Sequence, residues 1–348
     1  MNDEFWMRRC LDLAKKSIGK TSPNPMVGAV IIYQNKIIGE GYHTGYGNNH
    51  AEVEAINKVK NNNQLQKSSL YVNLEPCNHF GKTPPCVKLI IDKKIQNVII
   101  GTLDPNPKVS GMGVKRLKEN NINVKVGVLS KECKKLNKRF FCFHLKKRPF
   151  IILKWAESPE GLISNSNSNK NNIFWISSML SQQIAHKWRS EEDAILVGSN
   201  TVLLDNPKLN TRHHSGKSPI PIVIDPNKKV SKDHLLFKFH NKVFHYVKSI
   251  KNSEESNYIK MNFNNGLKEI LKDLYSKKIT SILVEGGLIT LQKFIDSNYW
   301  DEIRYFIGSK SIEKGLKAPM IKNKEIKSTV KISNDKLIYL LNPSSKTL

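Results

Sequence analysis

His50-Ala51-Glu52, followed by Pro76-Cys77 and Pro85-Cys86, is the stretch from which the fold and chemistry of this 348-residue chain can be worked out. One imidazole and two thiolates can hold a zinc ion, and three protein ligands leave the fourth tetrahedral position open for water, as in catalytic zinc sites. Two thiolates cancel the charge of the dication, so the metal is a weak Lewis acid that needs a helper base. We therefore predict His50, Cys77 and Cys86 as ligands and Glu52 as the proton-carrying base.

Short apolar runs alternate with helical patterns around this stretch. Strands are predicted at 26–33, 36–41, 69–75, 97–103 and 123–129. Helices are predicted from about 50 to 60, after Pro85, and near 113–120. Such alternation is typical of an α/β sandwich, and we expect its sheet to be largely parallel.

The polar break Lys146-Lys147-Arg148-Pro149 precedes a new apolar strand, which divides the chain into predicted domains 1–147 and 148–348. The length allows two domains, each with a core of its own. Strands of the second α/β domain are predicted at 150–154, 193–198, 220–225, 242–247, 280–284 and 301–307. Between the first two of these strands, the Asn- and Ser-rich tract 164–172 predicts an exposed, mobile loop.

The composition narrows the possible partners and the compartment. The net charge of +26 comes almost entirely from Lys spread over the whole length. This pattern, rich also in Asn and Ile, indicates compositional bias rather than a nucleic-acid surface, which would cluster Arg with aromatics. No apolar stretch approaches the roughly 20 residues that span a bilayer, so no membrane association is expected. Five Cys and no secretory signal favour a reducing cytoplasm.

The zinc ligands admit other assignments. His79 is an alternative fourth ligand, which would close the site and make the zinc structural. The remaining cysteines have no comparable setting and are expected to pack as small hydrophobic residues: Cys10, Cys133 and Cys142.

His-x-Glu followed by Pro-Cys-x-x-Cys is the pattern of zinc-dependent nucleobase deaminases. In this chain eight residues separate Cys77 from Cys86. A nucleoside, nucleotide or tRNA deaminase would share the chemistry and is one alternative, although the long spacing and the second domain argue against it. A zinc-stabilised RNA-binding protein without catalysis is another alternative. Glu52 argues against the latter, because a structural site needs no free carboxylate.

Further motifs in residues 1–145 extend the pattern. They are Ser22-Pro-Asn-Pro25, Val27-Gly28, Gly39-Glu-Gly-Tyr-His43, Leu74-Glu-Pro-Cys-Asn-His79 and Asp104-Pro-Asn-Pro107. With His50-Ala-Glu52 they resemble the deaminase half of the bifunctional riboflavin-biosynthesis deaminase-reductases. The resemblance implies a cytidine-deaminase-like zinc fold with the same ligands and base as above.

The resemblance also implies the substrate, 2,5-diamino-6-(5-phosphoribosylamino)pyrimidin-4(3H)-one, which is deaminated by hydrolysis. Asn24 and His43 match positions that hold the pyrimidine. The other interpretation of these two residues is an Asx-turn for Asn24 and a strand-end surface histidine for His43.

Two features of the second half indicate anion binding. Glu285-Gly286-Gly287 lies between a predicted strand and an amphipathic helix at 288–296, where backbone N–H groups can approach a phosphate. Arg189 and Arg212 stand out in a chain that otherwise prefers Lys, and a planar guanidinium suits a substrate phosphate.

The motifs of the second half resemble the reductase half of the same family. They are Lys154-Trp-Ala156, Trp175-Ile-Ser-Ser178, Arg189-Ser190, Ala194 to Pro207, Leu209-Asn-Thr-Arg212 and Val284-Glu-Gly-Gly287. The resemblance implies a dihydrofolate-reductase-like fold in which NADPH reduces the ribosyl group to ribityl, and a homo-oligomer. It places cofactor binding on Ala156, Trp175, Thr201, Asp205, Gly286 and Gly287. It places substrate binding on Lys154, Arg189, Leu209, Arg212 and Glu285.

The second half departs from the family pattern before Trp175. The usual Ser-Leu-Asp-Gly turn is Ser158-Pro159-Glu160-Gly161 here, and a Gly-Glu-Ser segment is replaced by Asn171-Asn172-Ile173. Ile173 cannot donate the hydrogen bond of a serine hydroxyl. A chain with an active deaminase half and a decayed reductase half is therefore a further alternative.

Overall fold

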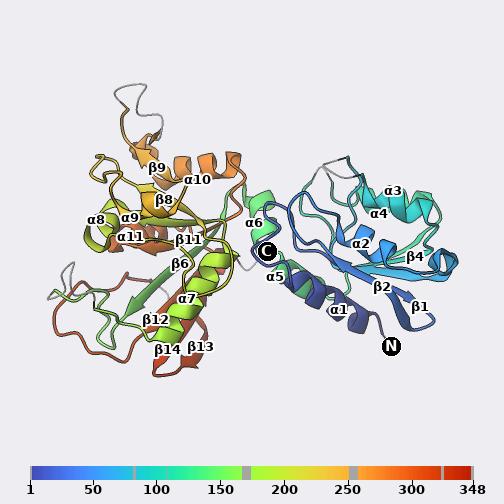
Figure 1. The fold of residues 1–348 in the computed structure, drawn as a ribbon, viewed down its shortest axis with the longest axis horizontal. Coiled ribbons are helices and arrows are strands. Elements are labelled where there is room, and N and C mark those ends of the chain that lie inside the picture. Colours follow the sequence, from blue (N-terminus) through green and yellow to red (C-terminus); the bar gives the residue numbers. More distant parts are fainter. Residues whose placement is uncertain are drawn as a thin grey trace. The chain divides into compact units, whose positions relative to one another are not determined.

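The structure is a computed structural model that describes residues 2–80, 84–107, 109–166, 174–250, 258–322 and 325–345. The chain forms two compact units, which divide between Lys147 and Arg148 (Figure 1). Most of the predicted Asn- and Ser-rich loop, together with Ile173, lies outside the described residues.

The first unit is built on a five-stranded sheet of order β2-β1-β3-β4-β5. Its strands are β1 (Gly28–Tyr33), β2 (Lys36–Tyr42), β3 (Ser69–Val72), β4 (Asn97–Ile100) and β5 (Asn123–Val126). The sheet is mixed: β1 runs antiparallel to both neighbours, whereas β2, β3, β4 and β5 share one direction. The expectation of a largely parallel sheet thus holds for four of the five strands, and β1 is the exception. The two-residue turn Gln34-Asn35, with φ of 47° and 60°, forms a tight hairpin, which requires antiparallel strands.

Helices cover both faces of this sheet. They are α1 (Asp3–Lys15), α2 (Ala51–Asn57), α3 (Cys86–Asp92), α4 (Met112–Glu119), α5 (Ser130–Leu136) and α6 (Lys138–Lys146). Alternate residues of β1 enter different cores. Ala29 and Ile31 pack with residues of α2 and α3, whereas Val30 and Ile32 pack with residues of α1. The period of two along a strand thus builds both cores from one segment.

The second unit is built on a nine-stranded sheet of order β10-β9-β8-β7-β11-β6-β12-β14-β13. Its strands are β6 (Phe150–Glu157), β7 (Ala194–Gly198), β8 (Ile220–Ile224), β9 (Phe244–Val247), β10 (Tyr258–Lys260), β11 (Ser281–Gly286), β12 (Glu302–Ile307), β13 (Ile326–Ile332) and β14 (Asp335–Leu341). The six strands predicted from the sequence are present. Strands β10, β13 and β14 are additions to the six predicted strands. β10 is only three residues long and β13 is exposed on both faces, whereas β14 is an apolar, largely buried strand that was not predicted.

The strands from β10 to β12 in this order run parallel, so their C-terminal ends meet at one edge of the sheet. The helices of this unit are α7 (Met179–Glu191), α8 (Ser199–Asp205), α9 (Leu235–Phe239), α10 (Leu267–Ser276) and α11 (Leu288–Asp296). Ligands of open parallel sheets bind at this C-terminal edge.

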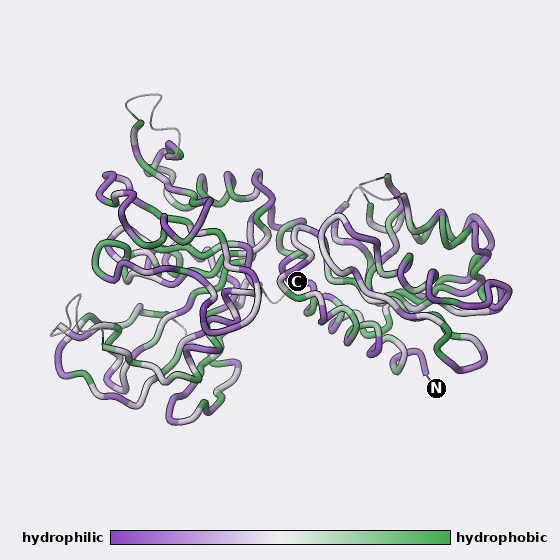
Figure 2. Tube along the Cα trace, viewed as in Figure 1, coloured by the Kyte–Doolittle hydropathy of each residue, from purple (hydrophilic) through white to green (hydrophobic). Residues whose placement is uncertain are grey.

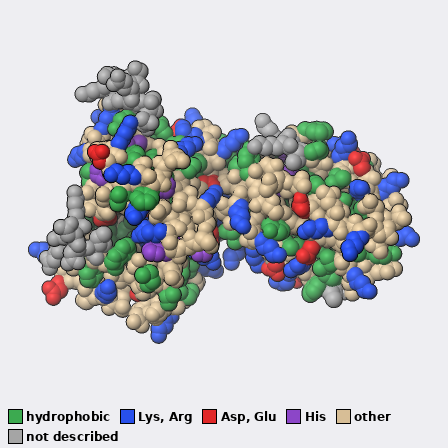
Figure 3. All heavy atoms as spheres, in the orientation of Figure 1, with side chains coloured by type: hydrophobic (Ala, Val, Ile, Leu, Met, Phe, Trp, Pro, Cys, Tyr) green, Lys and Arg blue, Asp and Glu red, His purple; other side chains and the backbone are tan. Residues whose placement is uncertain are grey.

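The chain is hydrophobic along its strands and hydrophilic in many loops (Figure 2). Within the described ranges, no helix is both long and apolar enough to span a bilayer. Lys and Arg side chains are scattered over the visible face of each unit in Figure 3.

Candidate active sites

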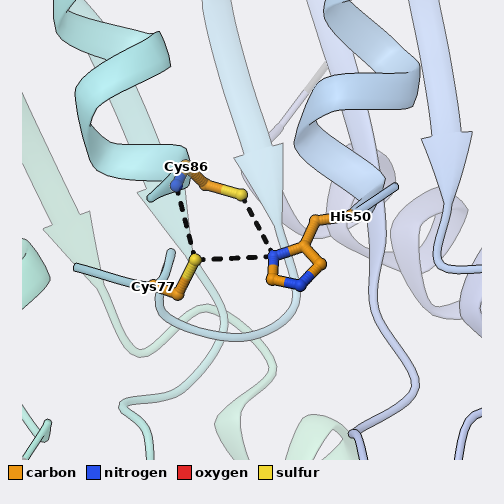
Figure 4. A group of neighbouring side chains, drawn as sticks. All are labelled: His50, Cys77 and Cys86. Atoms are coloured by element: carbon orange, nitrogen blue, oxygen red, sulfur yellow. Dashed lines mark hydrogen bonds between the residues drawn. The ribbon is translucent and has the colours of Figure 1, made fainter. Parts of the chain in front are cut away.

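Three predicted ligands converge at the ends of two helices of the first unit (Figure 4). His50 is the N-cap of α2, Cys77 follows β3, and Cys86 is the first residue of α3. His50 Nδ1 lies 3.4 Å from Cys77 Sγ and 3.3 Å from Cys86 Sγ. A tetrahedral zinc with bonds of about 2.0 Å to nitrogen and about 2.3 Å to sulfur separates those atoms by about 3.5 Å. The donor set and its spacing therefore fit zinc.

The two thiols are held in unlike electrostatic environments. The Cys86 thiol and its backbone N–H both donate toward Cys77 Sγ, the latter at 3.3 Å. These contacts and His50 lower the pKa of Cys77 well below its ordinary value, whereas the neighbouring Cys77 and burial raise the pKa of Cys86. The thiolate is the form that binds a metal, so Cys77 is prepared for that role.

Glu52 lies beside this centre, in the first turn of α2. Only 3% of the residue is exposed. Burial, assisted by the nearby Cys77, raises the pKa of Glu52 to about 7, against the opposing influence of His50. A carboxyl group with a pKa near neutrality is suited to accept and return a proton.

Asn24 and His43, predicted as substrate residues, lie together next to the centre. The rings of His43 and His50 are 5.5 Å apart in an edge-on arrangement. Asn24 Nδ2 donates to His43 Nε2 at 3.1 Å, and His43 Nδ1 lies 3.0 Å from the Asn49 carbonyl oxygen, which can only accept. His43 is therefore the neutral tautomer with its proton on Nδ1, and burial lowers its pKa accordingly.

The alternative fourth ligand is not part of the cluster. Among the described residues, the group that can share one metal comprises the three predicted ligands alone, and His79 is exposed. Cys10, Cys133 and Cys142 are completely buried and form no disulfide, in keeping with their expected role as packing residues.

A buried carboxylate that the sequence did not single out shapes the surroundings of the zinc centre. Glu75, 4% exposed, accepts backbone N–H groups at 2.9–3.2 Å. The donors are Asp104, Gly111, Gly113 and Val114. Glu75 thereby fixes the loop after β4 beside Cys77. In the sequence, the indication of this role was the position of Glu75 two residues before Cys77, in the motif Leu74-Glu75-Pro76-Cys77.

Two buried asparagines hold the segment that follows Asn24. Asn137 accepts from the Met26 N–H at 2.8 Å and donates to the Met26 carbonyl at 2.9 Å. Asn73 accepts from the Gly28 N–H at 2.8 Å and donates to the same carbonyl at 3.1 Å. The sequence offered no signal for these residues, because single asparagines are common in this chain.

Lys154, Arg189 and Glu285 form a charged cluster at the C-terminal edge of the second sheet. Lys154 comes from β6, Arg189 from α7 and Glu285 from β11. Arg189 binds both carboxylate oxygens of Glu285, at 2.9 and 2.7 Å, and Lys154 Nζ lies 3.9 Å from one of them. Burial raises the pKa of Glu285, but Arg189 and Lys154 outweigh it and hold the value at about 2.

Leu209 and Arg212 lie in the loop after α8, which Arg189 contacts. Arg189 Nη1 donates to the Asn210 carbonyl at 3.0 Å, and Leu209 is 2% exposed in a small core beneath the loop. Arg212 is exposed and donates only a long hydrogen bond, of 3.4 Å, to the Asn210 side chain. Its guanidinium is accessible to an anion.

His186 is a site residue that the sequence did not predict. It lies one turn before Arg189, with Nε2 3.5 Å from Arg189 Nη1, and its ring meets that of His213 edge-on. Burial, Arg189 and Arg212 lower the pKa of His186 to about 3, so the imidazole is neutral. The sequence did contain an indication: His186 lies three positions before Arg189, so the two side chains lie on the same face of one helix.

Gly286 is the last residue of β11 and Gly287 is the N-cap of α11, at the predicted turn from strand to helix. A Cβ atom on Gly287 would lie 3.0 Å from Thr201 Oγ1, so the glycine leaves a cradle beside that hydroxyl. Backbone N–H groups before a helix, next to a hydroxyl, fit a cofactor phosphate. The structure therefore brings three of the predicted NADPH residues together.

The other predicted cofactor residues stand apart from the charged cluster. Ala156 lies on β6 opposite Phe306 of β12, two residues beyond Lys154. Trp175 is 46% exposed, and Asp205 is the exposed last residue of α8. Within the part of the chain that the structure describes, neither Trp175 nor Asp205 makes a hydrogen bond or ion pair with the cluster.

The fold and the two sites define a zinc-dependent deaminase joined to an NADPH-dependent reductase. The profile of the cytidine and deoxycytidylate deaminase zinc-binding region matches residues 1–102, and that of the RibD C-terminal domain matches residues 149–337. The chain belongs to the RibD family of riboflavin-biosynthesis proteins. The expected fold class, enzyme class and cofactors, Zn²⁺ and NADPH, are thereby confirmed.

Relatives of known name cover the whole chain or its first half. The riboflavin biosynthesis protein RibD of Aquifex aeolicus is 38% identical over 344 residues, which are 96% of this chain and 95% of the relative. A diaminohydroxyphosphoribosylamino-pyrimidine deaminase of Buchnera aphidicola is 54% identical over 141 residues, 40% of this chain and 95% of its own.

One solved structure is similar over nearly the whole length of the chain. The deaminase/5-amino-6-(5-phosphoribosylamino)uracil reductase of Thermotoga maritima is 34% identical, with a TM-score of 0.86 and 98% of each chain covered.

Proposed function

We propose that this chain catalyses two consecutive steps of riboflavin biosynthesis on one phosphorylated pyrimidine. The first is hydrolytic deamination of 2,5-diamino-6-(5-phosphoribosylamino)pyrimidin-4(3H)-one. The second is reduction of the ribosyl group of the product to ribityl. The observation that carries the proposal is the convergence of His50, Cys77 and Cys86 beside the buried carboxyl of Glu52.

In the deaminase half, His50, Cys77 and Cys86 hold the zinc, which supplies Lewis acidity to the attacking water. Glu52 accepts a proton from that water and returns protons to the ring nitrogen and the departing amine, so that ammonia leaves and a carbonyl remains. Asn24, oriented by its hydrogen bond to His43, holds the pyrimidine ring.

In the reductase half, NADPH supplies the hydride that is added to C1 of the sugar. The amides at Gly286 and Gly287, with Thr201, hold a cofactor phosphate. Arg212 binds the substrate phosphate. Lys154, whose pKa is lowered by burial, donates a proton to the ring oxygen as the C1–O bond opens.

The test is to give the enzyme the diamino compound with NADPH and to follow ammonia release and NADPH oxidation separately. Glu52→Gln keeps the volume of the side chain and all three ligands. We expect the variant to retain zinc but to lose ammonia release by about 10²–10⁴-fold. NADPH oxidation disappears with the diamino compound and returns with the deaminated one. Retained ammonia release contradicts the proposal for the first half.

The same experiment decides between the alternatives. Ammonia release without NADPH oxidation, even from the deaminated compound, indicates a decayed reductase half. Deamination of cytosine nucleotides or tRNA in preference to the diamino compound indicates the other deaminase class. Zinc binding without any turnover indicates a non-catalytic RNA-binding protein. The comparisons favour none of these three.

We further propose that the chain forms a homo-oligomer in the cytoplasm and binds neither nucleic acid nor membranes. β13 is the exposed edge of the nine-stranded sheet, and an edge strand offers its backbone to a second copy. The spread of Lys along the whole sequence supports the expectation that no nucleic acid is bound, and on the face shown in Figure 3 Lys and Arg side chains are scattered. Light scattering coupled to gel filtration, with and without added RNA, tests the oligomer and the RNA expectation.

A further inference from the structure

Two loops of the second unit are bound to each other beyond the ends of β6 and β12. We call residues 158–166 and 308–318 the paired loops. Backbone hydrogen bonds of 2.8–2.9 Å join them: Ile163 N to Leu316 O, Ala318 N to Gly161 O, and Ser166 N to Lys314 O. The paired loops continue the pairing of the parallel strands β6 and β12, since Gly308 N donates to Glu157 O at 2.8 Å where the strands end.

Glu160 connects the paired loops through its side chain. Its carboxylate accepts from the Ser158 hydroxyl at 2.6 Å, the Ser311 hydroxyl at 2.7 Å and the Ile312 N–H at 3.1 Å. These three donors hold the pKa of Glu160 at about 2, so the carboxylate is ionised at neutral pH. The aspartate usual at this position has a side chain that is shorter by one carbon, about 1.5 Å.

The loop bound by Glu160 also contacts the residues on both sides of Trp175. A Cβ atom on Gly308 would lie 2.1 Å from the Ile176 carbonyl oxygen, so only glycine allows this approach. Lys310 Nζ lies 5.6 Å from the ring centre of Phe174. The residues before and after the indole thus pack on the segment that Ser311 and Ile312 fasten to Glu160.

Trp175 itself presents an open aromatic surface. It is 46% exposed, whereas the other four tryptophans of the chain are 5–7% exposed. An indole held by its neighbours and left open offers a face for stacking on a planar ring. Gly308, which contacts Ile176, follows β12 directly and donates to the carbonyl of Glu157, the last residue of β6, the strand that carries Lys154 and Ala156.

We infer that Glu160 is a positioning residue of the reductase half: it fastens the paired loops so that Trp175 is held ready for NADPH. The inference rests on the proposed function for the identity of the cofactor. Glu160 then holds the same turn that the family's aspartate holds. Its presence does not indicate a loss of reductase activity.

Glu160→Ala tests the inference. Loss of the three hydrogen bonds is expected to raise the KM for NADPH about tenfold. The kcat stays within about twofold and ammonia release is unchanged, because no atom of Glu160 meets a reacting group. Iodide quenching of tryptophan fluorescence gives a readout independent of turnover, since Trp175 is the one exposed tryptophan. NADPH protects this indole in the wild type and does so only at higher concentration in the variant.

Glu313→Ala is the matched control, because Glu313 is an exposed glutamate of the same loop with no recorded hydrogen bond among the described residues. It should leave both readouts unchanged.

Ser311→Ala should shift the KM for NADPH and the quenching in the same direction as Glu160→Ala but by less. The double variant should have the same KM and quenching as Glu160→Ala alone. Should Glu160→Ala fail to fold, Ser311→Ala carries the test.

An unchanged KM and unchanged quenching in Glu160→Ala overturn the inference, as does an equal effect of Glu313→Ala. A wild-type protein that does not oxidise NADPH with the deaminated compound contradicts the proposed function instead. NADPH binding measured by quenching still decides the role of Glu160 in that case.

Discussion

Replacing Glu285 with glutamine removes a negative charge from between two buried cations while keeping the volume of the side chain. The Glu285 side chain is 8% exposed, and those of Arg189 and Lys154 are 12% and 17% exposed. In the variant, both cations stay in a poorly solvated place without their counter-ion. Removing one partner of a buried pair is costly for this reason.

The size of the effect follows from the pKa of Glu285, which is lowered from 4.5 to about 2. At about 1.4 kcal/mol for each pH unit, the ionised carboxylate contributes about 3 kcal/mol to the stability of the second unit. For a unit of this size, that loss lowers the midpoint of thermal unfolding by about 6–12 °C. Because the pKa is depressed in the folded state, the contribution is complete above pH 4.5 and is lost as the pH falls through about 2.

Thermal unfolding followed by tryptophan fluorescence measures this effect, since four of the five tryptophans lie in the second unit. The difference between wild type and Glu285→Gln should be largest at neutral pH, shrink below pH 4.5 and vanish near pH 2. Zinc content and ammonia release are the controls and should not change. A midpoint lowered by less than about 2 °C at neutral pH refutes the electrostatic reasoning.

Three further changes probe the rest of the chain. Cys86→Ser removes one of three ligands, so zinc per chain should fall in elemental analysis and ammonia release should fall with it; a normal zinc content counts against the proposed centre. Glu75→Gln places an amide N–H against backbone donors, which should destabilise the first unit by about 1–3 kcal/mol in urea unfolding and leave NADPH oxidation of the deaminated compound intact. Asp301→Asn removes the carboxylate charge that Arg148 binds at 2.6 and 2.9 Å, and breaking this buried ion pair should cost about 3–5 kcal/mol; a calorimetric midpoint equal to that of the wild type would show that the pair contributes nothing.

The predicted elements came from local patterns, and the structure contains strands and helices at those places. It also brings the three side chains predicted as zinc ligands close together. A continuous apolar run predicted β1, because both faces of this strand are buried: Ala29 and Val30 lie in different cores. The zinc ligands lie at the ends of short elements whose start and stop signals are local. His50 immediately precedes α2, and Cys86 begins α3 directly after Pro85. The position of a ligand at such a boundary can therefore be predicted from the sequence around it.

Residues that work through a distant partner were not predictable in this way. Asn137 binds a backbone segment 111 positions away, and the carboxylate of Glu160 meets Ser311 across 151 positions. Strand β13 was missed because it is exposed on both faces and has no buried side to impose a period on the sequence. Its partner β14 is largely buried and apolar, so the sequence did carry a signal for that strand.

The sequence alone determined which chemistry the chain carries. A histidine, two cysteines and a glutamate at these spacings indicate a catalytic zinc site, and a Gly-Gly turn after an apolar strand indicates phosphate binding. Both conclusions follow from the chemical groups themselves. Only the tertiary structure decided how those groups are held. The bidentate contact of Arg189 with Glu285 spans 96 residues and depends on β11 lying between β6 and β7. Strand order is set by how whole faces pack together to bury apolar surface, and no local pattern of residues records that choice.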